Sequence, residues 1–129
     1  MQALFDNASE GMFFKDVDSR YEMVNKTFAN RLGFDEVSQV VGKTTYDLYP
    51  AHDAEMYRLD DIACMNSRQI SNTELEIPLP DGTELVQFAI KFPIVSADGS
   101  VIGLGGIDID ITDRKNLEQM KNEGAVPDN

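Results

Sequence analysis

Three segments in the second half of the chain alternate apolar with other residues, and this pattern constrains the fold more than any other feature. The alternating apolar positions are Leu75, Ile77 and Leu79 in residues 71–80, Val86, Phe88, Ile90, Phe92 and Ile94 in residues 84–95, and Ile107, Ile109 and Ile111 in residues 101–111. A period of two residues is typical of a half-buried strand. Each segment therefore predicts a β-strand.

The connections between these segments contain Asp81-Gly82 and Asp98-Gly99. Asp-Gly pairs supply the positive φ angles of tight hairpins, so the three strands are predicted to form an antiparallel meander. Residues 12–16 and 21–25 are two shorter apolar runs separated by four turn residues. They predict a further pair of strands near the N-terminus.

The pattern between the two groups of strands is helical. Residues 26–32 and 36–41 predict short helices, and Pro50 opens a longer helix through Ser67 in which Met56, Leu59 and Ala63 share one face. Strands at both ends with helices between them indicate an α+β domain, in which the helices gather on one face of an antiparallel sheet.

Composition excludes several classes of protein. The 129 residues are 42% hydrophobic, which is enough for one compact domain with one core, and no segment is apolar enough to predict membrane contact. The net charge of −12 argues against nucleic acid as a partner. A single cysteine, Cys64, excludes an internal disulfide framework and fits a cytoplasmic protein.

Motifs along residues 1–115 resemble the PAS domain family. They are Phe5-Asp6-Asn7-Ala8-Ser9-Glu10-Gly11-Met12-Phe13, Tyr21-Glu22-Met23-Val24-Asn25-Lys26-Thr27-Phe28, Asn30-Arg31-Leu32-Gly33-Phe34, Val41 to Pro50, Asp81-Gly82-Thr83, Asp98 to Gly103 and Asp108 to Lys115. The resemblance implies a five-stranded antiparallel sheet in the order 2-1-5-4-3. It also implies a cleft between the sheet and the longer helix, which in family members holds haem, flavin, a metabolite or nothing.

The resemblance further implies a non-catalytic sensor at residues 1–115, with an N-terminal entry helix. Residues 116–129 are then the start of a connector helix and a disordered tail. Such a module binds a small ligand or a partner and signals to an output domain, as in bacterial histidine kinases and diguanylate cyclases. The predicted cleft residues are Met56, Leu59, Ala63, Leu75, Ile77, Phe88, Ile90, Phe92, Ile107 and Ile109, and the predicted signal exit is Asp110, Thr112 and Arg114.

The identity of a cofactor stays open, and the residues argue against flavin and haem. Cys64 lies outside the flavin-adduct motif of the light-sensing branch of the family, and His52 is at the start of the helix rather than within it. Asp60 and Asp61 point about 100° apart on a helix and do not converge on one ion, so we expect both to be solvated.

Two rival functions remain. One is a ligand-free dimerisation adaptor whose cleft is filled by its own aromatic side chains. The other is a small α+β-barrel enzyme, which would need two convergent ionisable groups in the cleft. We also expect a homodimer, because Leu4 and Phe5 lie on one side of the short entry helix.

Overall fold

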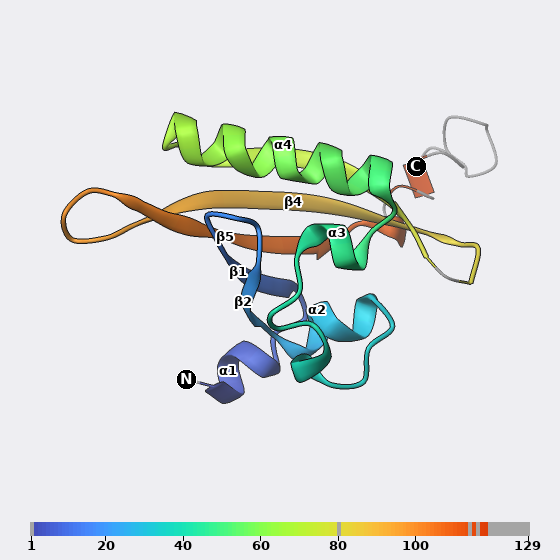
Figure 1. Ribbon diagram of the computed structural model, residues 1–129. Helices are drawn as coiled ribbons and strands as arrows, with labels where there is room; N and C mark the ends of the chain where they lie inside the picture. Colours follow the sequence, from blue (N-terminus) through green and yellow to red (C-terminus); the bar gives the residue numbers. More distant parts are fainter. Residues whose placement is uncertain (1, 80, 114, 116, 119–129) are drawn as a thin grey trace, which may run out of the picture.

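A computed structural model describes residues 2–79, 81–113, 115, 117 and 118. Its single sheet has five strands in the order β2-β1-β5-β4-β3, and neighbouring strands are antiparallel (Figure 1). The strands are β1 (Gly11–Asp16), β2 (Tyr21–Val24), β3 (Ser71–Pro78), β4 (Glu84–Val95) and β5 (Val101–Asp110). This confirms the predicted fold class and strand order.

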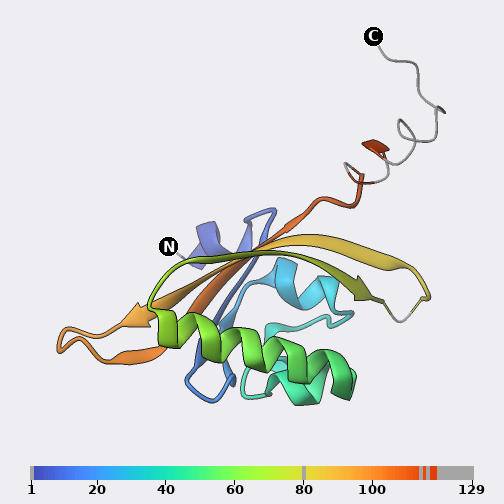
Figure 2. The same cartoon turned by 90° about the horizontal axis from the view of Figure 1, so that it is seen from above.

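The described residues form six helical segments beside the sheet. They are α1 (Gln2–Asp6), α2 (Lys26–Arg31), the 3-10 helix η1 (Val37–Gln39), α3 (Thr45–Leu48) and α4 (Ala51–Ser67), with helical residues again at Thr112, Asp113, Lys115, Leu117 and Glu118. Helix α4 runs alongside β4 and β5, and α2 packs on β1. Seen from above, the strands lie between α1 and α4 (Figure 2). No helix in the described part of the chain has both the length and the apolarity needed to span a bilayer.

The hairpin turns form where the Asp-Gly pairs predict them. Gly82 and Gly99 both have φ of +88°, a conformation that side-chain-bearing residues rarely adopt. In each turn the preceding aspartate accepts a hydrogen bond from a backbone N–H two residues on, at 2.9 Å from Thr83 N to Asp81 and from Ser100 N to Asp98. These turns fix the register of β3, β4 and β5.

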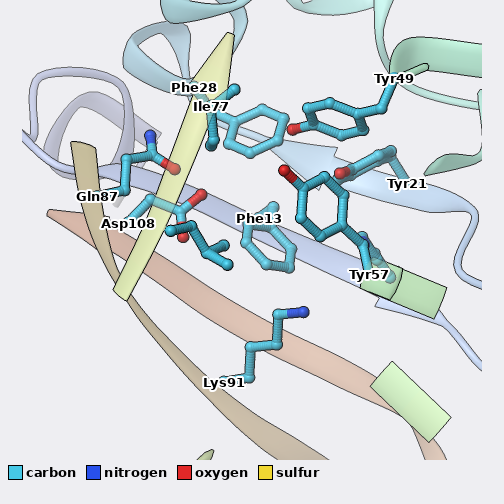
Figure 3. A pocket seen from close by; sticks show the side chains of 11 residues that line it. Phe13, Tyr21, Phe28, Tyr49, Tyr57, Ile77, Gln87, Lys91 and Asp108 are labelled. Atoms are coloured by element: carbon cyan, nitrogen blue, oxygen red, sulfur yellow. The ribbon is translucent and has the colours of Figure 1, made fainter. Parts of the chain in front are cut away.

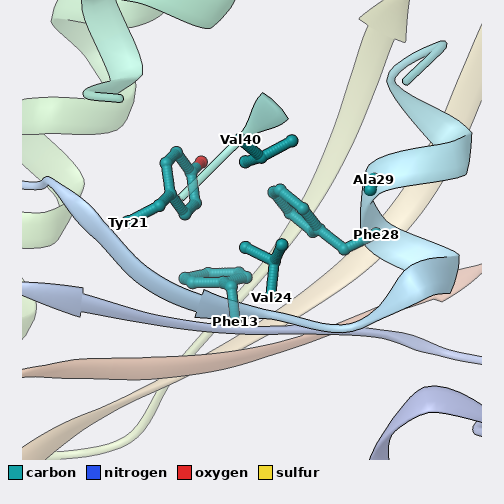
Figure 4. Packing of buried hydrophobic residues seen from close by; sticks show 6 residues of the cluster. All are labelled: Phe13, Tyr21, Val24, Phe28, Ala29 and Val40. Atoms are coloured by element: carbon teal, nitrogen blue, oxygen red, sulfur yellow. The ribbon is translucent and has the colours of Figure 1, made fainter. Parts of the chain in front are cut away.

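One end of the domain is held by an aromatic cluster beneath α2 (Figure 4). The rings of Phe13, Tyr21 and Phe28 lie 5.3 to 5.8 Å apart in edge and tilted contacts. Asn25 begins α2, and its side chain accepts from Phe28 N and Met12 N while donating to two carbonyl oxygens of the entry segment. This buried amide therefore joins the entry segment, β1 and α2.

The face of β4 that α4 covers differs from the one expected. Gln87, Ala89 and Lys91 are buried on the covered face, whereas the alternating apolar residues of β4 lie on the opposite face and are half-buried. The residues of the predicted cleft found on that opposite face are Phe88, Ile90, Phe92, Ile107 and Ile109. The expectation failed because Lys91 is buried against the carboxylate of Asp61 on α4, so hydrophobicity alone does not mark the covered face.

The phase of α4 also differs from the one expected. Its buried residues are Ala54, Tyr57, Asp61, Cys64 and Met65, which follow helical spacing. Met56 and Leu59 are 49% and 56% exposed, and Ala63 is exposed as well. The helix turns an aspartate toward the sheet and three apolar residues toward solvent, because two lysines on the sheet pair with that aspartate.

Candidate functional site

A cavity of about 30 Å³ lies between the sheet and α4 (Figure 3). Its lining comprises Phe13, Lys15, Tyr21, Phe28, Tyr49, Tyr57, Leu75, Ile77, Gln87, Lys91 and Asp108. Figure 3 shows Gln87 and Asp108 on one side and the rings of Tyr21, Tyr49 and Tyr57 on the other. The cavity thus combines aromatic walls with a polar end.

Two residues of the predicted cleft, Leu75 and Ile77, line this cavity. The other eight do not, because they lie on the exposed face of α4 or on the far face of the sheet. Of these, Phe88 and Ile109 border a separate surface hollow of about 430 Å³ beside the exit helix. Ligand binding by any of the ten stays a prediction.

Asp61 is the centre of a buried charge network beside the cavity. Its carboxylate lies 2.9 Å from the ammonium groups of both Lys15 on β1 and Lys91 on β4, and it accepts a 2.7 Å hydrogen bond from Ser19 Oγ. Lys15 also donates to Thr45 Oγ1 at 3.0 Å. The prediction that Asp61 is solvated is therefore wrong. Burial alone would raise the pKa of Asp61, but the two ammonium groups lower it below its usual value.

The Lys15 ammonium has aromatic partners in addition to its carboxylate. It lies 5.3 Å from the ring centroid of Phe13 and 4.8 Å from that of Tyr21. The negative face of an aromatic ring attracts a cation, most strongly where water is excluded. Lys15 is therefore held by both its carboxylate and its aromatic partners. A charged residue among the apolar residues of β1 was the sequence signal for this network.

Asp108 is a second buried carboxylate, and it lines the cavity itself. Burial raises its pKa to about 6, although the charges of Lys91, Lys15 and Arg31 oppose the rise. Within the described part of the chain, no hydrogen bond to its carboxylate oxygens is found, and Gln87 Oε1 is buried without a partner. A polar atom buried in this way has lost its hydration without replacement.

Three tyrosines form much of the opposite wall. The rings of Tyr49 and Tyr57 meet edge to face, with centroids 4.9 Å apart. Burial raises the pKa of all three hydroxyls, that of Tyr57 to about 12. At neutral pH these groups are uncharged phenols that both donate and accept hydrogen bonds.

Phe13 can lie flat on the sheet because Gly106 is its neighbour on β5. A Cβ atom at Gly106 would lie 2.1 Å from Phe13 Cζ, far inside van der Waals contact. Gly106 thus allows close packing and lets the Phe13 ring line the cavity.

The exit from β5 is held by polar contacts. Asp110 Oδ1 accepts a hydrogen bond from Thr112 N at 2.9 Å, and Thr112 Oγ1 accepts one from Val86 N at 3.0 Å. Lys115 then pairs with Glu74 of β3 at 3.1 Å. Arg114, the third residue of the predicted signal exit, lies outside the described residues, as do residue 116 and residues 119–129 of the predicted connector and tail.

Arg31 connects the cavity strand to the entry segment. Its Nη1 donates to the backbone oxygen of Asp108 at 2.7 Å, and its Nη2 donates to the backbone oxygen of Ser9 at 2.9 Å. No sequence pattern predicts this contact, because its partners are main-chain atoms 77 and 22 residues away.

The two residues weighed for cofactor attachment lie away from the cavity. His52 is exposed in the first turn of α4. Cys64 is 3% exposed, and burial raises the pKa of its thiol. Neither side chain lines the cavity.

Comparison with known proteins agrees with this geometry. A sequence model of the PAS fold matches residues 5–116. The methanogenesis regulatory histidine kinase FilI of Methanothrix harundinacea is 28% identical over 114 residues, which is 88% of this chain and 13% of the kinase. The chain therefore spans only a small part of the curated relative that it matches.

Several solved structures share the fold at low sequence identity. The complex of Vibrio cholerae VqmA with ligand and DNA has a TM-score of 0.80 at 19% identity, covering 97% of this chain and 58% of VqmA. The PAS domain of Bordetella pertussis BvgS has 0.76 at 20% identity, covering 95% and 92%. A PAS domain from Colwellia psychrerythraea has 0.73 at 22% identity, covering 86% and 93%. The chain belongs to the PAS fold family, whose members are generally non-catalytic sensor modules.

Proposed function

We propose that this domain is the sensor of a larger signalling protein and that it binds a small molecule in the cavity beneath α4. One observation carries the proposal. Asp108 lines the cavity, and it lies on the strand that leads two residues later to Asp110 and the exit. A ligand that changes the position of Asp108 therefore acts on the segment that continues to an output domain.

The relatives support a signalling role. FilI is a histidine kinase, so we infer a C-terminal kinase, or a diguanylate cyclase, as the output that this domain controls. VqmA has been seen with a ligand, and it shares the fold. A ligand shifts the output only by the difference between its affinities for two states of the domain. The exit contacts of Asp110 and Thr112 are where we expect those states to differ.

The ligand-free dimerisation adaptor is the alternative, and one observation favours it. Five aromatic side chains line the cavity and leave only about 30 Å³. We also infer a homodimer through the entry helix, because Leu4 is 73% exposed on α1. In the adaptor, the dimer would be the functional unit and the cavity would hold only water.

Native mass spectrometry of the freshly purified protein tests both functions. The sensor predicts a bound small molecule that leaves on gentle activation, and the adaptor predicts a dimer with no added mass. Leu4→Asp should weaken the dimer, whereas Leu59→Asp, at a similarly exposed leucine on α4, should not. A ligand-free protein at every concentration, with no small molecule recovered from full-length protein, would overturn the sensor proposal.

A further inference from the structure

Asp108 is a buried carboxylate to which the described part of the chain supplies no counter-ion of its own. The residue is 7% exposed and lines the cavity beneath α4. The ammonium groups of Lys15 and Lys91 each lie 2.9 Å from the carboxylate of Asp61, so both cations are already paired. An ionised carboxylate at this place has lost most of its hydration, whereas a protonated carboxyl group loses far less on burial.

Charged and titratable side chains face Asp108 from the elements around it. They are Lys91 on β4, Lys15 on β1, Arg31 on α2, Asp61 and Tyr57 on α4, Tyr21 on β2, and Tyr49 just before α4. Asp61 stays ionised at neutral pH because the two ammonium groups lower its pKa, and the phenols stay neutral because burial raises theirs. Burial raises the pKa of Asp108 to about 6. Among these carboxyl and phenol groups, Asp108 is therefore the one whose charge changes near neutral pH.

Gln87 places an acceptor next to this carboxyl group. It is 4% exposed, and its Oε1 is buried without a partner in the described part of the chain. Ala89 of β4 is directly opposite Asp108 of β5, and Gln87 is two residues from Ala89 on the same face. Gln87 and Asp108 are thus diagonal neighbours, which long side chains can bridge, and Ala89 is too short to separate them. Figure 3 shows both side chains at the same end of the cavity.

One proton satisfies both of these buried polar groups. An amide oxygen and an ionised carboxylate are both acceptors, so they cannot form a hydrogen bond with each other. A protonated carboxyl group carries an O–H that can donate to Gln87 Oε1. Because this bond exists only in the protonated state, it favours uptake of the proton. The cavity of about 30 Å³ has room for one or two water molecules through which the proton can exchange with solvent.

The two residues lie next to the contacts that hold the exit. Asp110, two residues after Asp108, accepts a hydrogen bond from Thr112 N at 2.9 Å. Thr112 Oγ1 in turn accepts one from the backbone N–H of Val86, the residue before Gln87, at 3.0 Å. A hydrogen bond that forms between β4 and β5 here therefore acts on the segment where the chain leaves the sheet.

We propose that Asp108 and Gln87 form a proton-sensing pair, in which the protonated carboxyl group donates a hydrogen bond to Gln87 Oε1 and the ionised carboxylate does not. The input is a proton, so acidification changes the exit contacts of Thr112 without any small-molecule ligand. This inference goes beyond the proposed function, because the pair operates in a cavity that holds only water.

The titration of Asp108 tests the pair directly. NMR of the side-chain carboxyl carbons of the 129-residue protein, recorded between pH 4 and pH 8, should show an Asp108 transition at about pH 6. Gln87→Met keeps the length of the side chain but removes the strong acceptor, and it should lower this midpoint by about 0.5–1 pH unit. Gln69→Met, at an exposed glutamine, is the matched control and should leave the midpoint unchanged. A midpoint that Gln87→Met leaves unchanged or raises would overturn the pair.

A second variant tests whether the proton affects the exit. Asp108→Asn carries permanent N–H donors for Gln87 Oε1, so it imitates the protonated state. In the unmodified protein, the amide signals of Ile111 and Thr112 should shift with the same midpoint as Asp108. In the Asp108→Asn protein at pH 7.5, these signals should resemble those of the unmodified protein at pH 5.

The outcomes separate this proposal from the proposed function. Exit signals that do not follow the titration of Asp108 would show that the carboxyl group titrates without signalling, which overturns the proton sensor. The exit signals of the unmodified protein decide this point even if the Asp108→Asn variant does not fold. Binding of a small molecule is measured separately by native mass spectrometry, so either proposal can fail while the other stands.

Discussion

Lys91 Nζ lies 2.9 Å from Asp61 Oδ1, with the carboxylate fully buried, so β4 and α4 are joined by a largely buried charge pair. The same carboxylate binds Lys15 of β1. Three elements distant in sequence are thereby held together by one side chain of α4. The pairing also fixes which face of the helix meets the sheet.

The first prediction concerns Asp61 and its neighbour. Asp61→Asn leaves two buried ammonium groups without a counter-ion, and it should lower the free energy of unfolding by about 3–5 kcal/mol. Asp60→Asn is the matched control, because Asp60 is exposed, and its effect should stay within about 0.5 kcal/mol. Urea unfolding measures both. Similar losses in the two variants would show that the network does not stabilise the fold.

The second prediction is a pH dependence caused by Asp108. Its pKa is raised from 3.8 to about 6 in the folded protein, so the folded state binds this proton more tightly than the unfolded chain. The resulting stability is fully present below pH 4 and is lost as the pH rises through 6. Two pKa units correspond to about 3 kcal/mol.

Asp108→Asn removes this titration. As the pH rises from 4 to 7, the unmodified protein loses this stability and the variant does not. The free energy of unfolding of the variant should therefore rise by up to about 3 kcal/mol relative to that of the unmodified protein. Asp110→Asn, at an exposed carboxylate on the same strand, serves as the control and should show no such gain. Urea unfolding at several pH values gives the comparison, and parallel curves for all three proteins would contradict the prediction.

The third prediction concerns the contact between Gly106 and Phe13. Gly106→Ala places a methyl group against the ring, and it should destabilise the domain by about 3 kcal/mol. Phe13→Leu removes the ring atoms that clash, so the double variant should be more stable than the sum of the two single effects implies. If the losses of stability in thermal or urea unfolding are additive, the destabilisation by Gly106→Ala does not come from its contact with Phe13.

The fourth prediction concerns the exit. Asp110→Ala removes the acceptor for Thr112 N and should cost about 1 kcal/mol of stability. In the full-length protein, ligand binding should no longer change the activity of the output domain. The affinity for the ligand should stay unchanged, because Asp110 does not line the cavity. Asp113→Ala, another exposed aspartate close by, is the control. Normal signalling in the Asp110→Ala protein would show that the Asp110 contact connects the two segments but does not transmit the signal.

The strands and their turns could be predicted because period-two alternation and Asp-Gly pairs are local signals, whereas the order of the strands in the sheet followed from the resemblance to the PAS family. The cavity could not, because its polar residues are stabilised by partners far away in sequence. Residues 84–95 do contain a hint. Leu85 and Ala89 place apolar side chains on the second face of β4, which indicates that both faces are partly buried and that apolar content alone does not select the one beneath the helix.

On α4, choosing the buried face from apolar residues alone selected the exposed face of the helix. Met56, Leu59 and Ala63 follow helical spacing, but so do Tyr57 and Asp61. Choosing between the two requires the knowledge that Lys15 and Lys91 come from the sheet to meet Asp61. Hydrophobic spacing predicts that an aspartate is exposed to solvent. Asp61 is buried instead because partners distant in sequence pair with its charge.

Arg31 also connects the entry segment to β5 through two hydrogen bonds to backbone carbonyl groups. Its planar guanidinium holds the carbonyl groups of Ser9 and Asp108 at a set separation. A displacement of the backbone at Ser9 must either carry Asp108 with it or break a hydrogen bond. Coupling of this kind is reciprocal. For a cavity that binds a ligand as we propose, we therefore expect a displacement at Ser9 to change the affinity for that ligand, and the bound ligand to change the position of Ser9. One arginine thus ties the entry segment to the strand that leads to the exit.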